Sequence, residues 1–215
     1  MDNHTWRTFL LSRLTINIIR KDWFEHRKVI LSLTAGMFVP LIISGGRTDF
    51  AKGMMIGVLI GASYGYAHFC FMAERQRGTL QLLLSLPVHP LDLVIAKYAS
   101  LYSMVLFTAN VPGVFLRDFR ALFLLNSLVL LLSSICMAAT VISDKPWAPM
   151  IPLWFVLIFF MPIRKLLEQF YPDGLSAYLF VTSHVMLVAA LALISAPVIA
   201  LISALYFERR FTYVD

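Results

Sequence analysis

Apolar residues along this chain come in long runs, and polar residues gather in the short stretches that separate them. A helix needs about 20 consecutive, mostly apolar residues to cross the core of a bilayer. Six runs near this length are predicted to span a membrane: residues 29–46, 53–73, 93–111, 121–142, 147–163 and 177–206. The pattern therefore predicts an all-α polytopic membrane protein in which residues 1–215 form a single transmembrane domain.

Two further stretches have mixed polarity and are predicted to be helices at the membrane surface. In residues 1–28, Arg13, Arg20 and Arg27 recur every seven residues, so they share one face of a helix. A basic helix of this kind is typical of the cytoplasmic interface. Residues 164–177 set leucines and Phe170 against charged side chains, which predicts a short amphipathic helix on the outer side before the last span.

Two features inside the apolar runs modify this picture. Residues 147–163 contain Pro149, Pro152 and Pro162, so this span is predicted to be kinked or broken. Lys97 lies one turn inside residues 93–111, where a lysine side chain is expected to snorkel to the interface.

Composition supports the membrane class. Apolar residues make up 60% of the chain and charged residues 14%, whereas soluble domains average about 45–50% and about 25%. The mean hydropathy is +0.79. The formal net charge of +6 does not indicate nucleic-acid binding, because the basic residues flank apolar runs instead of forming one patch.

The distribution of lysine and arginine predicts the orientation. Twelve of the 18 basic residues fall in segments that are inside if the N-terminus is cytoplasmic, and cytoplasmic loops carry the excess of positive charge. We therefore expect a multi-pass protein of the bacterial cytoplasmic (plasma) membrane, with both termini and residues 74–92 in the cytoplasm.

The cytoplasmic stretch between the second and third spans is predicted to be helical. Arg77, Gln81 and Ser85 recur at four-residue spacing, while Leu80, Leu83 and Leu84 lie on another side of the same helix. Pro87 is expected to stop this helix, and Pro90 is expected to open the next one after His89, with Asp92 in its first turn. Leucines outside the bilayer must be buried against the lipid interface or another protein.

This stretch resembles the coupling helix of the membrane subunit of ABC-2-type ABC transporters. The matching residues are Glu74, Arg75, Gly78, Thr79, Leu82, Leu83, Leu84, Ser85, Leu86, Pro87, Val88 and Lys97. Gln81 departs from the pattern, because the family often carries Glu after Gly-Thr-Leu. The order of the six predicted spans also matches the family along the whole chain.

The resemblance implies the partners and their contact residues. A separate ATP-binding cassette ATPase would be contacted by Glu74, Arg75, Arg77, Gly78, Thr79, Leu80, Leu82, Leu83, Leu84, Ser85, Leu86 and Pro87. A second contact would involve Arg20, Lys21 and Arg27 on the N-terminal helix. The chain would be half of an exporter, pairing with a second membrane subunit in a homo- or heterodimer that encloses the path of a drug, lipid or peptide.

Two groups of residues within the second span suggest packing and a path. Gly53, Gly57, Gly61 and Gly65 are each four residues apart, which predicts close approach of another helix. Whether that helix belongs to this chain or to a second copy is open. Tyr64 and His68 lie one turn apart and are candidates either for the substrate path or for a structural hydrogen bond.

The chain lacks the residues that an energy-converting enzyme needs. No GxxxxGK[ST] phosphate-binding loop occurs, so no cofactor is expected here and ATP and Mg²⁺ would bind to the partner subunit. No metal-ligand or catalytic spacing is present, and the spans lack paired acidic residues, which disfavours ion coupling. The alternatives are a non-transporting membrane scaffold and an intramembrane enzyme.

Overall fold

The fold is known from a computed structural model, which describes residues 3–43, 48–85, 89–114, 119–143, 145, 147–152, 154 and 185–212. Among these residues the regular elements are all helical. They are α1 (Asn3–Ile43), α2 (Thr48–Ala67), the π-helix η1 (His68–Met72), α3 (Ala73–Gln76), α4 (Thr79–Leu84), α5 (Pro90–Gly113), α6 (Phe119–Ile142), the short 3₁₀-helix η3 (Ala148–Met150) and α9 (Val185–Thr212).

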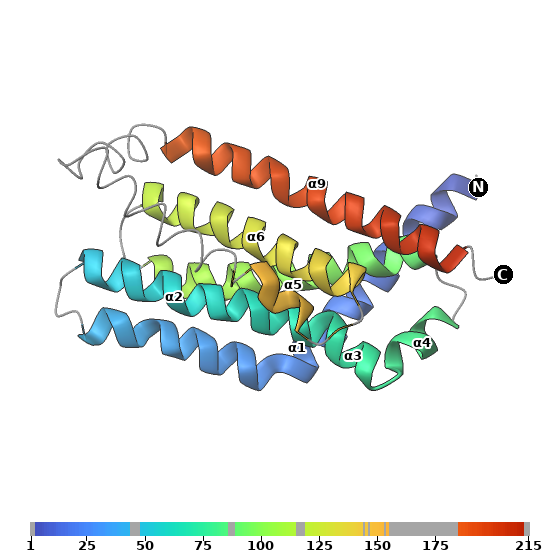
Figure 1. Cartoon of the computed structure of the whole chain (residues 1–215), viewed down its shortest axis with the longest axis horizontal. Helices are drawn as coiled ribbons and strands as arrows, with labels where there is room; N and C mark the ends of the chain where they lie inside the picture. The colour runs from blue at the N-terminus through green and yellow to red at the C-terminus, as the bar shows by residue number, and fades with distance from the viewer. Residues whose placement is uncertain are drawn as a thin grey trace.

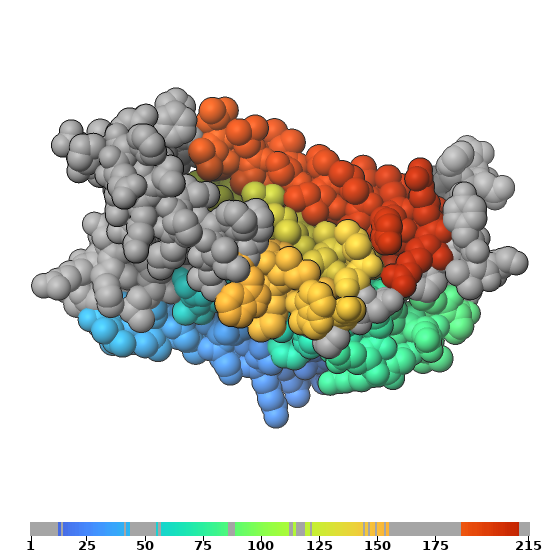
Figure 2. Space-filling view, viewed as in Figure 1, coloured from blue at the N-terminus to red at the C-terminus, as the bar shows by residue number. Residues whose placement is uncertain are grey.

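The long helices run side by side along the length of the molecule (Figure 1). Both chain ends and α4 lie at the same end of the bundle, and the C-terminal end of α1 and the start of α2 lie at the opposite end. In Figure 2, α9 forms one edge of the visible face and α1 forms the other, with η3 between them. The α3–α4 segment therefore lies at the same end of the bundle as the start of α1 and the end of α9.

Three helices of the described part are long and apolar enough to cross a membrane, at Pro90–Val111, Leu122–Ile142 and Met186–Arg210. They correspond to the predicted spans 93–111, 121–142 and 177–206. The predicted spans 29–46 and 53–73 fall in α1 and α2, and they stay predictions. Most of residues 147–163 and all of the predicted outer helix 164–177 lie outside the described residues.

Helix boundaries differ from the predicted ones in two places. The predicted interfacial helix and first span form one uninterrupted helix, α1, of 41 residues. Residues 48–76 are likewise continuous through α2, η1 and α3, with a π-helical turn at His68–Met72. The predicted start of the next helix is confirmed: α5 begins at Pro90, and the backbone N–H groups of Asp92 and Leu93 donate to the carbonyl oxygen of His89.

Hydroxyl groups join α5 to its neighbours inside the apolar bundle. The Tyr98 hydroxyl is 2.7 Å from Ser203 Oγ on α9, and the Tyr102 hydroxyl is 2.6 Å from Ser134 Oγ on α6. The Tyr66 hydroxyl on α2 is 2.8 Å from Thr108 Oγ1 on α5. In lipid, where apolar burial between helices adds little, such bonds and close packing hold a bundle together. α5 is therefore the central helix on which the others are assembled.

Candidate functional site

The segment that leads to α4 is shaped by a π-helical turn and one glycine. A π-helix holds an extra residue in its turn, so it rotates the residues that follow around the helix axis, and such turns are frequent at functional sites. Here η1 immediately precedes Glu74, whose carboxylate is buried. Gly78 then adopts φ +74°, a left-handed conformation that glycine accepts without strain. The chain turns at Gly78 and continues as α4, which projects from the bundle (Figure 1).

Lys97 of α5 occupies the centre of a buried ion cluster. Its side chain is 0% exposed, and its Nζ donates to Asp22 Oδ1 and to Glu74 Oε1, each at 2.8 Å. Asp22 belongs to α1 and Glu74 to α3, so one ammonium group joins three helices. Among buried groups such charge-assisted bonds are the strong ones.

The position of Lys97 corrects one expectation from the sequence. The expectation that its side chain snorkels to the interface is wrong, because α1 and α3 cover it and supply two carboxylates that replace water around the ammonium. Asp22 and Glu74 themselves lie just outside the predicted spans 29–46 and 53–73, so the prediction that the spans lack paired acidic residues is not contradicted. Asp22 and Glu74 are buried and meet a lysine that belongs to the apolar segment Pro90–Val111.

A second lysine stands at the edge of the cluster. Lys21 contacts Glu74 Oε1 and lies 3.5 Å from Glu25 Oε2 and 4.0 Å from Asp22 Oδ1, with 39% of its side chain exposed. Two lysines thus face three carboxylates. The other carboxylate oxygens, Asp22 Oδ2 and Glu74 Oε2, are buried and accept no hydrogen bond from the described residues.

The three carboxylates satisfy one requirement of a metal site. One oxygen from each of Asp22, Glu25 and Glu74 can be chosen so that all lie within 4.8 Å of one another, and hard cations such as Mg²⁺ and Ca²⁺ prefer oxygen ligands. However, the ammonium groups of Lys21 and Lys97 already occupy the space between these oxygens and neutralise them. The cluster is consequently better described as an ion-pair network than as a metal centre.

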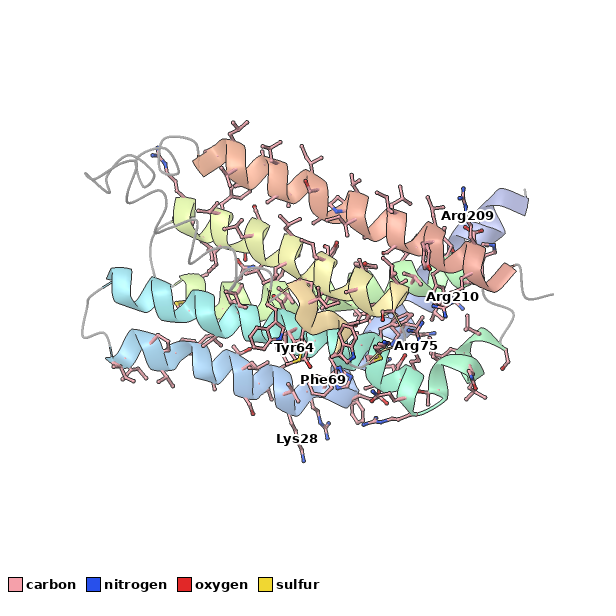
Figure 3. The ribbon with its side chains drawn as sticks, viewed as in Figure 1. Lys28, Tyr64, Phe69, Arg75, Arg209 and Arg210 are labelled. Carbon is pink, nitrogen blue, oxygen red and sulfur yellow. The ribbon has the colours of Figure 1, made fainter. Side chains whose placement is uncertain are left out.

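Arg75 attaches the same segment to a different helix. Its Nη1 donates to the carbonyl oxygens of Thr140 and Ser143 at 3.0 and 3.1 Å, at the C-terminal end of α6. Arg210 of α9 donates to the neighbouring carbonyl of Ile142 at 3.5 Å. Figure 3 shows Arg75 and Arg210 close to one another at this end of the bundle. Cations satisfy the free carbonyl groups and the negative dipole of a helix C-terminus.

The residues that the resemblance assigns to ATPase contact separate into two groups. Glu74 and Leu80 are buried within this chain, Arg75 is half-buried, and Leu83 and Leu84 are half-buried against the core. The exposed members are Arg77, Gly78, Thr79, Leu82 and Ser85. Leu86 and Pro87 lie outside the described residues. Leu82 is 67% exposed whereas Leu80 is 3% exposed, so Leu82 is the apolar side chain that α4 presents outward.

The second predicted contact lies on α1. Arg20 and Arg27 are exposed, and the guanidinium of Arg27 lies 4.4 Å from the centre of the Phe24 ring. Lys21, the third residue of that prediction, is committed to the ion cluster. Lys28 points away from the bundle (Figure 3). Arg20 and Arg27 are seven residues apart and therefore share one face of α1.

The glycines of α2 do not face another described helix of this chain. A Cβ atom built on Gly57 or Gly61 would meet no atom within 4 Å, and one on Gly65 would only touch the Phe69 ring at 4.0 Å. The surroundings of Gly53 lie outside the described part. No helix of the described part of the chain therefore packs closely along this row.

Tyr64 and His68, the predicted path residues, stack loosely on the same helix. Their ring centroids are 6.0 Å apart, and within the described residues no hydrogen bond joins the two side chains. His68 Nδ1 is buried without a partner. Nearby, His26 of α1 stacks on Phe69 at 5.3 Å. Burial lowers the pKa of His26, with Asp22 acting in the opposite direction, so this imidazole is neutral at pH 7.

Asp22 is the functional residue that sequence reasoning missed. It lies four residues after Ile18 and eight before Ile30, and all three are buried along one side of α1. A charged residue on the apolar stripe of a helix was the available signal, because such a residue must find a partner inside the protein.

Comparisons with known proteins give no further identification. No family model, no curated protein and no solved structure matches this chain. The resemblance to ABC-2-type membrane subunits rests on the residues around Glu74–Lys97 and on the order of the apolar runs.

Proposed function

We propose that this chain is the membrane subunit of an ATP-driven exporter of the ABC-2 type. In this proposal α4 is the coupling helix, which docks on a separate ATPase subunit in the cytoplasm. Two such membrane subunits form the path of a small amphipathic or apolar substrate. ATP binding closes the ATPase dimer, displaces the two α4 helices, and switches the path between inward and outward openings as rigid bodies.

The proposal is carried by one observation: α4 is exposed, and the segment directly before it is firmly attached to the bundle. α4 projects at the end of the bundle where both termini lie, and it presents Leu82 outward. Directly before it, Glu74 is tied to α1 and α5, and Arg75 is tied to α6. A loop helix that only rests on lipid has no need of these buried attachments, whereas a helix that receives a mechanical load does.

Leu82→Glu tests this proposal. If Leu82 is buried in a cleft of the ATPase, the substitution places a carboxylate against apolar surface at a cost of several kcal/mol, and about 1.4 kcal/mol already reduces affinity tenfold. We expect loss of at least about 90% of the co-purifying ATPase at equal membrane expression. The ATPase is identified by mass spectrometry through its GxxxxGK[ST] loop.

Gln81→Glu is the matched control. It introduces the same charge one residue earlier, at an exposed position of the same helix, and should leave ATPase recovery unchanged. Equal recovery with wild type and Leu82→Glu would refute docking through α4. Leu83→Glu is a weaker test, because Leu83 also packs against the core of this chain.

The buried cluster favours one second candidate, an ion-coupled carrier. Ionisable residues inside a membrane protein often form proton relays. Within the described part of the chain, Asp22 and Glu74 each keep one buried oxygen that accepts no hydrogen bond. In that case transport would follow an ion gradient and would not require ATP. The lysines that neutralise both carboxylates favour the exporter proposal instead.

A further inference from the structure

We propose that Lys97 and its two carboxylate partners form the switch that transmits movement of α4 to the membrane helices. This inference rests on the proposed function and assigns the transmission step to specific atoms. Lys97 is a positioning residue in this scheme: it acts through Glu74 on one side and Asp22 on the other.

The hydrogen bonds of the cluster connect the segment before α4 to the helices α5 and α1. Only Arg75, Gln76, Arg77 and Gly78 separate Glu74 from the start of α4. Glu74 bonds to Lys97, and Lys97 bonds to Asp22, which lies 75 residues away in the sequence. A pull on α4 therefore reaches α5 and α1 through two hydrogen bonds of 2.8 Å.

Stability does not account for the presence of these charges. Desolvating two carboxylates and an ammonium group offsets most of their attraction, and neutral residues of similar volume are often equally stable in such places. Buried ionic groups are best attested where they define a register or a switch between arrangements. The cluster lies between three helices, where register matters most.

The cluster also has a second arrangement available to it. Lys21 is within 4.0 Å of Asp22, Glu25 and Glu74, so it has three acceptors to choose from. Asp22 Oδ2 and Glu74 Oε2 are buried and offer further acceptor positions. If Glu74 moves away from Lys97, it keeps Lys21 while Lys97 keeps Asp22. Alternative pairing of this kind lets α3 shift between two defined states instead of deforming continuously.

Arg75 supplies the fixed point of this movement. It donates to the backbone carbonyl groups of Thr140 and Ser143 at the end of α6, outside the cluster. Glu74 and Arg75 are adjacent, so a rotation of α3 about the Arg75 attachment changes the Glu74–Lys97 distance first. In this scheme α3 rotates about the attachment of Arg75 to α6, and the Glu74–Lys97 bond holds it to α5.

The experiment uses the complex of the full chain with the ATPase that co-purifies with it. Spin labels are placed at exposed positions 28 on α1 and 201 on α9, and their separation is measured without nucleotide and with ATP plus vanadate. In the wild-type complex we expect a nucleotide-dependent shift. In the variant Asp22→Asn/Glu74→Gln/Lys97→Met the shift should be lost, while ATPase recovery and ATP hydrolysis are retained.

The neutral triple variant separates switching from stability, because it leaves no buried charge of the triad unpaired. The double variant Asp22→Asn/Lys97→Met, in which Glu74 keeps Lys21, carries the same expectation, so the test does not depend on one variant folding. Lys21→Met should also reduce the shift, because it removes the lysine that Glu74 keeps after it leaves Lys97. Lys145→Met is the control: it removes an exposed lysine outside the cluster and should preserve the shift.

Two results would overturn the inference: no nucleotide-dependent shift in the wild-type complex, or a shift of wild-type size in the neutral variants. Failure of the proposed function is a different result, since then no ATPase is recovered with the wild-type chain at all.

Discussion

At the scale of single residues, Lys97 shows how the surroundings of a side chain decide its role. A lysine near the end of an apolar run reaches the interface when nothing polar lies closer. Here Asp22 and Glu74 lie closer, and α1 and α3 cover the side chain completely. The ammonium is therefore held in the interior by the two carboxylates that it neutralises.

Removing Lys97 alone should destabilise the protein strongly. Lys97→Met leaves two buried carboxylates with only the half-exposed Lys21 near them, and breaking a buried ion pair costs about 3–5 kcal/mol. We expect a clear fall in the unfolding temperature of the detergent-solubilised chain. The neutral triple variant should recover most of it, since it removes the unpaired charges.

Lys21→Met serves as the comparison for that measurement. Lys21 is partly solvated, and exposed ion pairs contribute little to stability, so its loss should shift the unfolding temperature much less. If Lys97→Met unfolded at the wild-type temperature, Lys97 would not be the cation on which the buried carboxylates depend.

At the scale of helices, α2 carries a row of glycines, Gly57, Gly61 and Gly65, against which no other helix of the described part of the chain packs. Small residues let helix backbones approach closely in lipid. A row with open space above it is therefore available for a helix of a second subunit, which agrees with the proposed dimer.

Gly57→Leu tests this use of α2. Because a Cβ at Gly57 meets no atom within 4 Å, the larger side chain should leave the unfolding temperature of the single chain nearly unchanged. It should nevertheless shift the purified complex from two membrane subunits towards one, as measured by light scattering. Leu201→Ala on the exposed side of α9 is the control. A dimer unaffected by Gly57→Leu would show that the glycine row faces lipid.

At the scale of the whole molecule, the bundle brings its polar chemistry to one end. Arg75, Arg209, Arg210, α4 and both termini are grouped there. The rest of the described bundle is joined by hydroxyl groups, by the Asn126–Asn110 amide pair and by apolar packing. This division suits a protein that receives force at one end and changes shape along its length.

The energy source distinguishes the exporter from the ion-coupled carrier. In vesicles containing the purified complex, export of ethidium or of an NBD-labelled phospholipid should require ATP. The chain has no phosphate-binding loop, so vesicles with this chain alone and ATP should be inactive. A pH gradient without ATP should also give no transport. Transport driven by the gradient alone would instead support the carrier.

The sequence by itself determined the helical membrane class of the protein and the approximate positions of three long apolar helices. Apolar runs of membrane length and proline positions act locally, which is why α5 starts at Pro90 as predicted and why three long apolar helices are present in the described part. The same reasoning located the α4 segment, because Gly78 and the leucines that follow it lie within a few residues of one another.

Only the tertiary structure decided which charges meet and which leucine faces outward. Asp22 and Lys97 are 75 residues apart, and no local pattern connects them, since their pairing depends on how α1 and α3 cover α5. For the same reason helical spacing grouped Leu80 with Leu83 and Leu84 but left open which side the bundle covers. Packing buries Leu80 and exposes Leu82, because the turn at Gly78 sets the direction in which α4 leaves the bundle.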